Sequence, residues 1–148
     1  MPIYFYSVRE KPYGCFSNFS RHGIPAQGVY WPTVEHYFQA QKFPGTDYEQ
    51  QIRLAKTPKQ AKALGQSRQH PLRPDWEAVK DGIMAEAVLL KFQTHAELRA
   101  ILLGTGDEVI VENAPNDFYW GCGADGSGLN KLGQILMQVR AQLRAENA

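Results

Sequence analysis

The chain has 148 residues, of which 43% are hydrophobic, and this is enough for one domain with a real core. Its mean hydropathy of −0.43 and the lack of a long apolar run exclude a membrane-spanning segment. The 16 basic and 15 acidic residues give a net charge of +1 without any basic tract. We therefore expect no extended nucleic-acid surface, because neutralising phosphates needs clustered Lys and Arg.

The first part of the chain predicts two short strands and a helix. Residues 3–7 alternate in the way of a strand, and the Pro- and Gly-rich stretch 12–28 predicts turns. Residues 29–31 predict a second strand that leads into the helix. Thr33 can accept a hydrogen bond from a free amide of the first turn, and Pro44 with the glycine after it stops the helix.

This early helix carries the first group of candidate site residues. At about 100° per residue, Glu35, Gln39 and Lys42 project from one side. A carboxylate, an amide and an ammonium in one line, edged by aromatic rings, can form the wall of a small-molecule pocket. The alternative is a solvated helix face whose two charges are too distant to interact.

The middle of the chain predicts further helices. Thr57 caps a helix that starts with Pro58, and Gly65 is read as its stop. Asp75 caps the next helix. Helical spacing predicts a buried face on that helix, made of Trp76, Val79, Ile83, Ala87 and Leu90.

The last third predicts two helices around a strand. Thr94-x-x-Glu97 is a capping box that opens one helix, which ends at Gly104. Residues 109–111 predict a strand, and the final helix starts near Leu129. The apolar stripe of that helix is Leu132, Ile135, Leu136, Val139 and Leu143. These elements predict an α+β fold, mostly helical, with a small β-sheet.

A glycine-rich segment precedes the final helix. Glycines such as Gly121 and Gly123 let backbone amides approach a ligand closely, and a helix N-terminus favours anions. A phosphate could rest there, with Ser127 and Asn130 as side-chain donors. The alternative is an ordinary flexible loop.

Asp117 lies at the start of this segment, before three aromatic residues. A carboxylate packed against Phe118, Tyr119 and Trp120 would lose solvent, which raises its pKa and suits it to proton transfer. The alternative is an Asx turn, in which Asp117 bonds its own backbone. Trp76 has two readings as well, because its indole can pack in the core or stack on a heterocycle.

The cysteines and histidines do not suggest a metal site. Cys15 and Cys122 are isolated and are expected to be small buried residues. The four histidines are scattered, and His36 is interpreted as structural. We expect no metal and no redox cofactor. The first residues lack the basic and apolar regions of a secretory signal, so we expect a cytoplasmic protein.

Four blocks, in order along nearly the whole chain, resemble the YbiA-like, or NADAR, family. These blocks are Phe16-Ser17-Asn18-Phe19, Trp31-Pro32-Thr33 through Lys42-Phe43, Leu72-Arg73 with Asp75-Trp76, and Asn116-Asp117 through Asn130-Lys131-Leu132-Gly133. The resemblance implies one YbiA-like domain over residues 1–148 and an N-glycosidase activity. Bacterial members close to this pattern hydrolyse early phosphoribosylated pyrimidine intermediates of riboflavin synthesis, and others remove ADP-ribose from guanine bases.

The family's key glutamate, tryptophan, aspartate and lysine fall on Glu35, Trp76, Asp117 and Lys42, with Asp125 as an alternative aspartate. Carboxylates suit this chemistry, because breaking a C1′–N bond passes through an oxocarbenium-like state. We predict Glu35 as the main catalytic carboxylate, with Asp117 and Lys42 as partners. Lys42 either holds the 5′-phosphate or, with a lowered pKa, forms a Schiff base. The predicted substrate-binding residues are Asn18, Gln39, Trp76, Trp120, Gly121, Gly123 and Asn130.

The prediction is thus a hydrolase for a small phosphoribosyl-pyrimidine. ADP-ribosylated guanine is the alternative substrate, and a non-catalytic module that binds such ligands is the alternative class. The presence of Glu35, Lys42 and Asp117 favours catalysis. A shared site requires the fold to bring Glu35 and Asp117 together, with Trp76 lining the same cavity.

Overall fold

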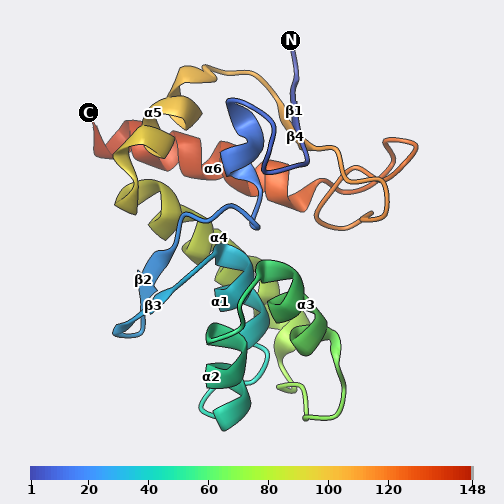
Figure 1. Cartoon of the computed structure of the whole chain (residues 1–148). Helices are drawn as coiled ribbons and strands as arrows, with labels where there is room; N and C mark the ends of the chain where they lie inside the picture. The colour runs from blue at the N-terminus through green and yellow to red at the C-terminus, as the bar shows by residue number, and fades with distance from the viewer. Residues whose placement is uncertain (148) are drawn as a thin grey trace. The chain divides into compact units, whose positions relative to one another are not determined.

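The computed structural model describes residues 1–147 and contains, within them, six α-helices, one 3-10 helix and four short strands (Figure 1). The predicted α+β class is confirmed. The chain divides into two compact units, one of residues 21–91 and one of residues 1–20 with the segment that follows Lys91. Within residues 1–147, no helix is long and apolar enough to cross a membrane.

The unit of residues 21–91 combines a hairpin with helices. Its elements are β2 (Ile24–Ala26), β3 (Val29–Trp31), α1 (Val34–Ala40), α2 (Asp47–Arg53), α3 (Pro58–Gln66) and most of α4 (Trp76–Thr94). Strand β3 was predicted, but β2 was not, because Pro25 in its centre indicated a turn. Pro25 is exposed in this two-stranded antiparallel pair, where its missing N–H matters least. Gln27 and Gly28, with φ of 56° and 78°, make the tight turn between the strands.

Threonine caps begin the three short helices of this unit. Thr33, Thr46 and Thr57 each accept a hydrogen bond from the backbone N–H three residues later. The caps predicted at Thr33 and Thr57 are confirmed, whereas α2 was missed although Thr46 and Glu49 have capping-box spacing. Helices α1, α2 and α3 pack against one another side by side (Figure 1).

Two predictions for the helices of this unit are wrong in detail. Helix α3 does not stop at Gly65 but continues to Gln66, and Gly65 is buried inside its last turn. Helix α4 begins at Trp76 as predicted, but Val79, Ile83 and Leu90 are only half-buried. Its fully buried positions are Trp76, Met84, Ala87, Val88, Lys91 and Phe92.

The other unit contains a parallel strand pair and two helices. Its elements are β1 (Ile3–Phe5), a 3-10 helix η1 (Tyr13–Phe16), α5 (Ala96–Gly104), β4 (Ile110–Glu112) and α6 (Lys131–Glu146). Strand β1 pairs with β4 in parallel, with Ile3 opposite Ile110. Helix α6 packs on β4 with the predicted apolar stripe buried. Thr94 is the last residue of α4 and His95 precedes α5, so the predicted Thr94 cap is wrong.

Candidate active site

Helix α1 is buried on every side, and this places its polar residues in the interior. Glu35, Gln39 and Lys42 are only 7%, 4% and 7% exposed. The alternative of a solvated helix face is therefore wrong. Lys42 lies just beyond the end of α1, where its backbone N–H donates to the Gln39 carbonyl over 3.2 Å and continues the turn. The three predicted residues are brought together.

The Glu35 carboxylate is held by its neighbour one turn later. The Gln39 side chain donates from Nε2 to Glu35 Oε2 over 2.7 Å. An amide donor can hold a carboxylate in one orientation without neutralising its charge. Such a fixed, buried anion is well placed to stabilise positive charge that develops on a substrate.

Lys42 lies beside the Trp76 indole and the end of α3. Its Nζ donates to the Gly65 carbonyl over 3.3 Å and lies 5.7 Å from the centre of the Trp76 ring. The pKa of Lys42 is lowered from 10.5 to about 8, first by burial and then by the Arg68 charge, while the Glu35 charge opposes this. A large fraction of neutral amine therefore forms at mildly alkaline pH.

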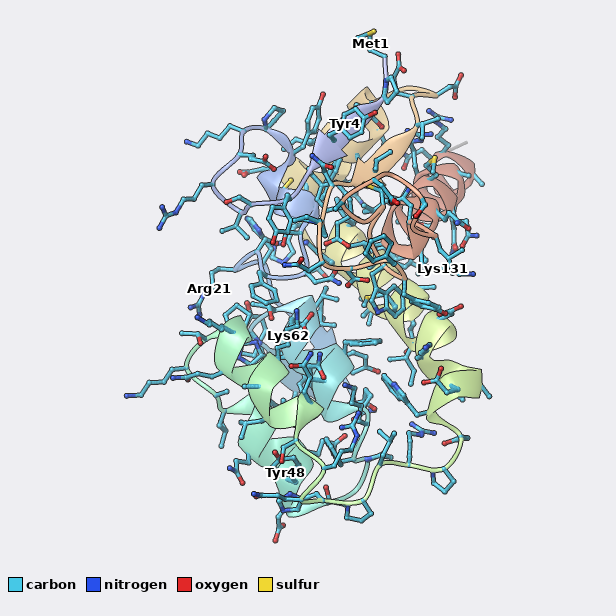
Figure 2. The ribbon with its side chains drawn as sticks, turned by 90° about the vertical axis from the view of Figure 1, so that its right-hand side faces the viewer. Met1, Tyr4, Arg21, Tyr48, Lys62 and Lys131 are labelled. Carbon is cyan, nitrogen blue, oxygen red and sulfur yellow. The ribbon has the colours of Figure 1, made fainter. Side chains whose placement is uncertain are left out.

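Two lysines on other helices also affect the pKa of Lys42 through their charges. The charges of Lys62 on α3 and Lys80 on α4 both contribute to lowering the pKa of Lys42. Figure 2 labels Lys62, which is an exposed residue. Three cations (Arg68, Lys62 and Lys80) thus act on Lys42 against one anion, Glu35, and such an excess of positive charge suits an anionic ligand.

The segment before α4 fixes Trp76 relative to Lys42. The Arg73 backbone N–H donates to the Lys42 carbonyl over 3.0 Å, and the Trp76 N–H donates to the Arg73 carbonyl over 3.3 Å. The Arg73 guanidinium also binds Asp75, with Nε 2.6 Å from Oδ1. Trp76 is 5% exposed, and its ring centre lies 5.0 Å from that of Phe38. Trp76 is thus a buried wall of the Glu35–Lys42 cluster.

A second polar network holds the C-terminal end of α1. The Gln41 side chain donates to Glu49 Oε2 over 3.1 Å and accepts from Gln27 Nε2 over 3.0 Å. Glu49 is 6% exposed. Tyr48 of α2, labelled in Figure 2, donates from its hydroxyl to the Leu64 carbonyl over 2.6 Å. These contacts tie α1, α2 and α3 together, and sequence reasoning missed them because they join residues of unrelated spacing.

His36 was interpreted as structural, and its ring contacts two neighbouring segments. Its ring nitrogens lie 2.8 Å from Thr33 Oγ1 and 3.0 Å from the Ala55 carbonyl. Burial lowers the pKa of His36, and the hydrogen bond with Ala55 opposes this. The imidazole is therefore neutral near pH 7 and links the start of α1 to the segment after α2.

The second group of predicted residues lies in the loop before α6, in the other unit. Asp117 Oδ1 accepts hydrogen bonds from the backbone N–H groups of Tyr119 (3.0 Å) and Trp120 (2.8 Å). This is the Asx turn that was the alternative to a desolvated acid. Trp120 is half-buried, with its ring edge toward Tyr119 at 4.9 Å between centres. Asp125 is exposed and accepts from the Ser127 hydroxyl over 2.7 Å.

The amides of this loop are directed at the loop itself. The N–H groups of Lys131 and Leu132, in the first turn of α6, donate to the carbonyls of Tyr119 and Trp120 over 3.0 Å each. The Gly123 N–H donates to the Ala114 carbonyl over 3.1 Å. The predicted phosphate cradle at the start of α6 is therefore wrong, because these donors are already used.

Three other predicted binding residues make close contacts within their own unit. Asn130, in a left-handed conformation with φ of 54°, accepts from the Glu112 N–H (2.9 Å) and donates to the Ile110 carbonyl (2.9 Å). Gly121 is packed so closely that an added Cβ would lie 2.8 Å from the Ala114 Cβ. The positive φ of 74° at Gly123 favours glycine. These contacts give the loop its shape.

Asn18 and the two cysteines differ in how far they are buried. Asn18 is half-buried just after η1, in the same unit as the Asp117 loop. Cys15 is buried as predicted, whereas Cys122 is half-buried. Among residues 1–147, no group of three or more His, Cys, Asp and Glu side chains is arranged to hold a metal ion. That Glu35 and Asp117 share one cavity stays a prediction.

Comparison with known proteins gives consistent matches over almost the whole chain. The NADAR domain model matches residues 4–144. An N-glycosidase of Nostoc punctiforme is 58% identical, over 97% of this chain and 94% of that protein. N-glycosidase YbiA of Escherichia coli is 49% identical, over 97% of this chain and 89% of its own length. The NMR structure of E. coli YbiA matches with a TM-score of 0.92 and 48% identity, over 99% of this chain and 87% of that one.

A plant relative matches over a smaller part of its length. The chloroplastic riboflavin biosynthesis protein PYRR of Zea mays is 44% identical, over 88% of this chain and 23% of that protein. Together with the bacterial matches, the similarity defines the class: this protein is a hydrolase that acts on N-glycosyl bonds. Within that class the chain belongs to the NADAR family, and the resemblance predicted from its motifs is confirmed.

Proposed function

We propose that this N-glycosidase hydrolyses the C1′–N bond of phosphoribosylated pyrimidine intermediates of riboflavin biosynthesis, in the cytoplasm. The observation that carries the proposal is the buried cluster of Glu35, Gln39, Lys42 and Trp76. The name of the maize relative, a riboflavin biosynthesis protein, supports this substrate class. The product pair would be ribose 5-phosphate and the free aminopyrimidine.

In this proposal Glu35 is the principal catalytic carboxylate. Cleavage of a C1′–N bond builds positive charge on the sugar, and a fixed carboxylate lowers the energy of that state. Gln39 supports this role because its amide orients Glu35 from 2.7 Å away. Trp76 provides an aromatic wall on which the pyrimidine or the sugar can pack, and its position beside Lys42 supports a place at the substrate.

Lys42 has two chemically distinct roles open to it. As a cation it would bind the 5′-phosphate, for which Arg68, Lys62 and Lys80 add positive potential. As a neutral amine it would attack C1′ of the ring-opened substrate. In that substrate C1′ forms an imine with the pyrimidine nitrogen. The Lys42 amine adds to C1′, and its two protons pass to the pyrimidine nitrogen, which leaves as the free amine. Water then hydrolyses the resulting Schiff base to release the sugar phosphate and regenerate the Lys42 amine.

The pH dependence of turnover distinguishes these roles. The pKa of Lys42 is about 8. If the neutral amine attacks, kcat/KM rises with pH and levels off above that value. If the ammonium binds phosphate, kcat/KM falls as the pH passes that value. Lys42→Arg retains a cation and lacks a nucleophilic amine, so it keeps activity only in the second case.

We further propose that Asp117, Trp120 and the loop around them also bind the substrate. The Asx turn at Asp117 holds the backbone from which Trp120 extends, and this supports a rigid platform for stacking. Gly121, Gly123 and Asn130 would contribute by shaping this loop, and Asn18 would contact the substrate from the segment just after η1. In this assignment Asp117 acts as an acid or base.

The experiment that tests the proposed function offers two substrate classes to the same enzyme. Purified protein is incubated with 5-amino-6-(5-phosphoribosylamino)uracil and, separately, with ADP-ribosylated guanine, and the freed base and sugar are measured by chromatography. Release of ribose 5-phosphate by the wild type and a loss of at least about 100-fold in Glu35→Gln supports the proposal. Release from ADP-ribosylated guanine alone overturns the substrate, and tight binding without hydrolysis of either favours a binding module.

A further inference from the structure

Gly65 lies where α3 packs against α1, next to Gln39. It is a buried residue in the last turn of α3. A Cβ atom added to it would lie 2.1 Å from Gln39 Oε1, 2.7 Å from Gln39 Cβ and 2.8 Å from Gln39 Cδ. Non-bonded heavy atoms do not approach a Cβ atom that closely, so Gln39 already fills the space that a side chain at position 65 would need.

The backbone itself does not require glycine at this position. Gly65 is helical, and no positive φ is found there. Glycine inside a helix costs about 1 kcal/mol relative to alanine. Gly82 of α4 provides the contrast, because a Cβ there would meet nothing within 4 Å among the described residues. The close approach of Gln39 is therefore the feature that makes glycine necessary at position 65.

Gly65 contacts Lys42 directly and is connected to Glu35 through Gln39. On one side the Gln39 side chain fills the space that a Gly65 Cβ would take, and the Gln39 amide donates to Glu35 over 2.7 Å. On the other side its carbonyl accepts from Lys42 Nζ over 3.3 Å and from Arg68 Nη1 over 2.9 Å. Gly65 thus holds the Gln39 amide, which orients the Glu35 carboxylate. Its own carbonyl orients the Lys42 amine.

We propose that Gly65 is a positioning residue that sets the separation of the Glu35 carboxylate and the Lys42 amine. The inference rests on the catalytic roles proposed above for those two residues. A methyl group at position 65 has to displace the Gln39 amide or push α3 away from α1. The first change loosens Glu35, and the second withdraws the Gly65 carbonyl from Lys42.

Gly65→Ala tests the inference, with Gly82→Ala as the matched control. We expect kcat of Gly65→Ala to fall by about 10- to 100-fold, because small displacements of reacting groups cost that much. KM should change by less, since no substrate contact is removed. The apparent pKa of Lys42 should fall, because the ammonium loses an acceptor. Gly82→Ala should keep the wild-type kcat and Lys42 pKa.

The pKa of Lys42 can be measured without substrate. The rate at which acetic anhydride modifies Lys42 in the folded protein is followed against pH by mass spectrometry of the peptide that contains it. A Gly65→Ala protein with both the wild-type kcat and the wild-type Lys42 pKa overturns the inference. If Glu35→Gln retains full turnover, the proposed function fails by itself, and the acetylation measurement still tests the positioning.

A second pair of variants keeps the test decisive if Gly65→Ala folds poorly. Gln39→Ala removes Oε1 and Cδ, and with them two of the three close contacts of the added methyl group. The Gly65→Ala substitution should therefore lower Tm by several degrees in the wild-type background, as overpacking does, and by clearly less in the Gln39→Ala background. An equal loss of Tm in both backgrounds overturns the inference.

Discussion

Replacing Lys42 by methionine should abolish turnover and at the same time stabilise the protein. Burial holds the pKa of Lys42 at about 8, against 10.5 for an exposed lysine. At about 1.4 kcal/mol for each pH unit, the buried ammonium lowers the free energy of unfolding by about 3 kcal/mol at pH 7. Methionine has a similar length and no charge to desolvate, so this cost disappears in the variant.

Part of the gain is offset by a lost hydrogen bond. Lys42 donates to the Gly65 carbonyl, and a neutral bond of this kind contributes about 1 kcal/mol. The carbonyl keeps a partner, because Arg68 donates to it over 2.9 Å. We therefore expect Lys42→Met to raise the free energy of unfolding by about 2 kcal/mol, which corresponds to a Tm higher by about 4–8 °C.

The size of the effect changes with pH in a defined window. The folded protein releases the Lys42 proton near pH 8 and the unfolded chain near 10.5. Between these values the unfolded state binds more protons, so wild-type stability rises with pH relative to Lys42→Met. Urea unfolding at pH 7 and about 9.5 measures this, with the exposed Lys59→Met as control. A variant that is less stable than the wild type at pH 7, or an advantage that does not shrink at the higher pH, refutes the reasoning.

Three further predictions follow from single side chains. Burial lowers the pKa of His36 below 6.5, so unfolding free energy should fall by up to about 1.4 kcal/mol per pH unit below that value, and His36→Gln should lose this dependence in denaturation curves. Trp120→Ala should raise KM about ten-fold by loss of stacking while lowering Tm by only a few degrees; the opposite pattern would make Trp120 structural. Asp117→Asn keeps an acceptor for the Tyr119 and Trp120 amides, so a kcat reduced about 100-fold at unchanged Tm identifies an acid–base role, and wild-type kcat identifies a turn residue.

Local signals in the sequence predicted the elements that depend on local physics. Thr33 and Thr57 cap their helices because a hydroxyl three residues before a free amide needs no tertiary partner. The apolar stripe of α6 was predicted in full, because one face of that helix packs on the core and the other meets water. The cluster of Glu35, Gln39 and Lys42 was also predicted, since all three lie within about two turns of one segment.

The parts that were missed depend on contacts between distant segments. Strand β2 contains Pro25, which indicates a turn in isolation but is tolerated at an exposed position of a two-stranded pair. The solvated-face alternative for α1 failed because neighbours cover that helix on every side, which no pattern within the helix reveals. The phosphate cradle before α6 failed because carbonyls of residues 119 and 120 already bind the amides of the first turn.

Gly65 shows that a residue near a functional site can depart from the structure that its residue type usually predicts. Glycine after an apolar helical segment predicts a stop, yet α3 continues through it to Gln66. Three features that each lower stability meet at this contact of α1 and α3: glycine inside a helix, the buried Lys42 ammonium, and Gln39 Oε1, which has no hydrogen-bond partner among the described residues. Selection for stability alone would replace such features. Their concentration beside Glu35 is the pattern expected where geometry serves catalysis.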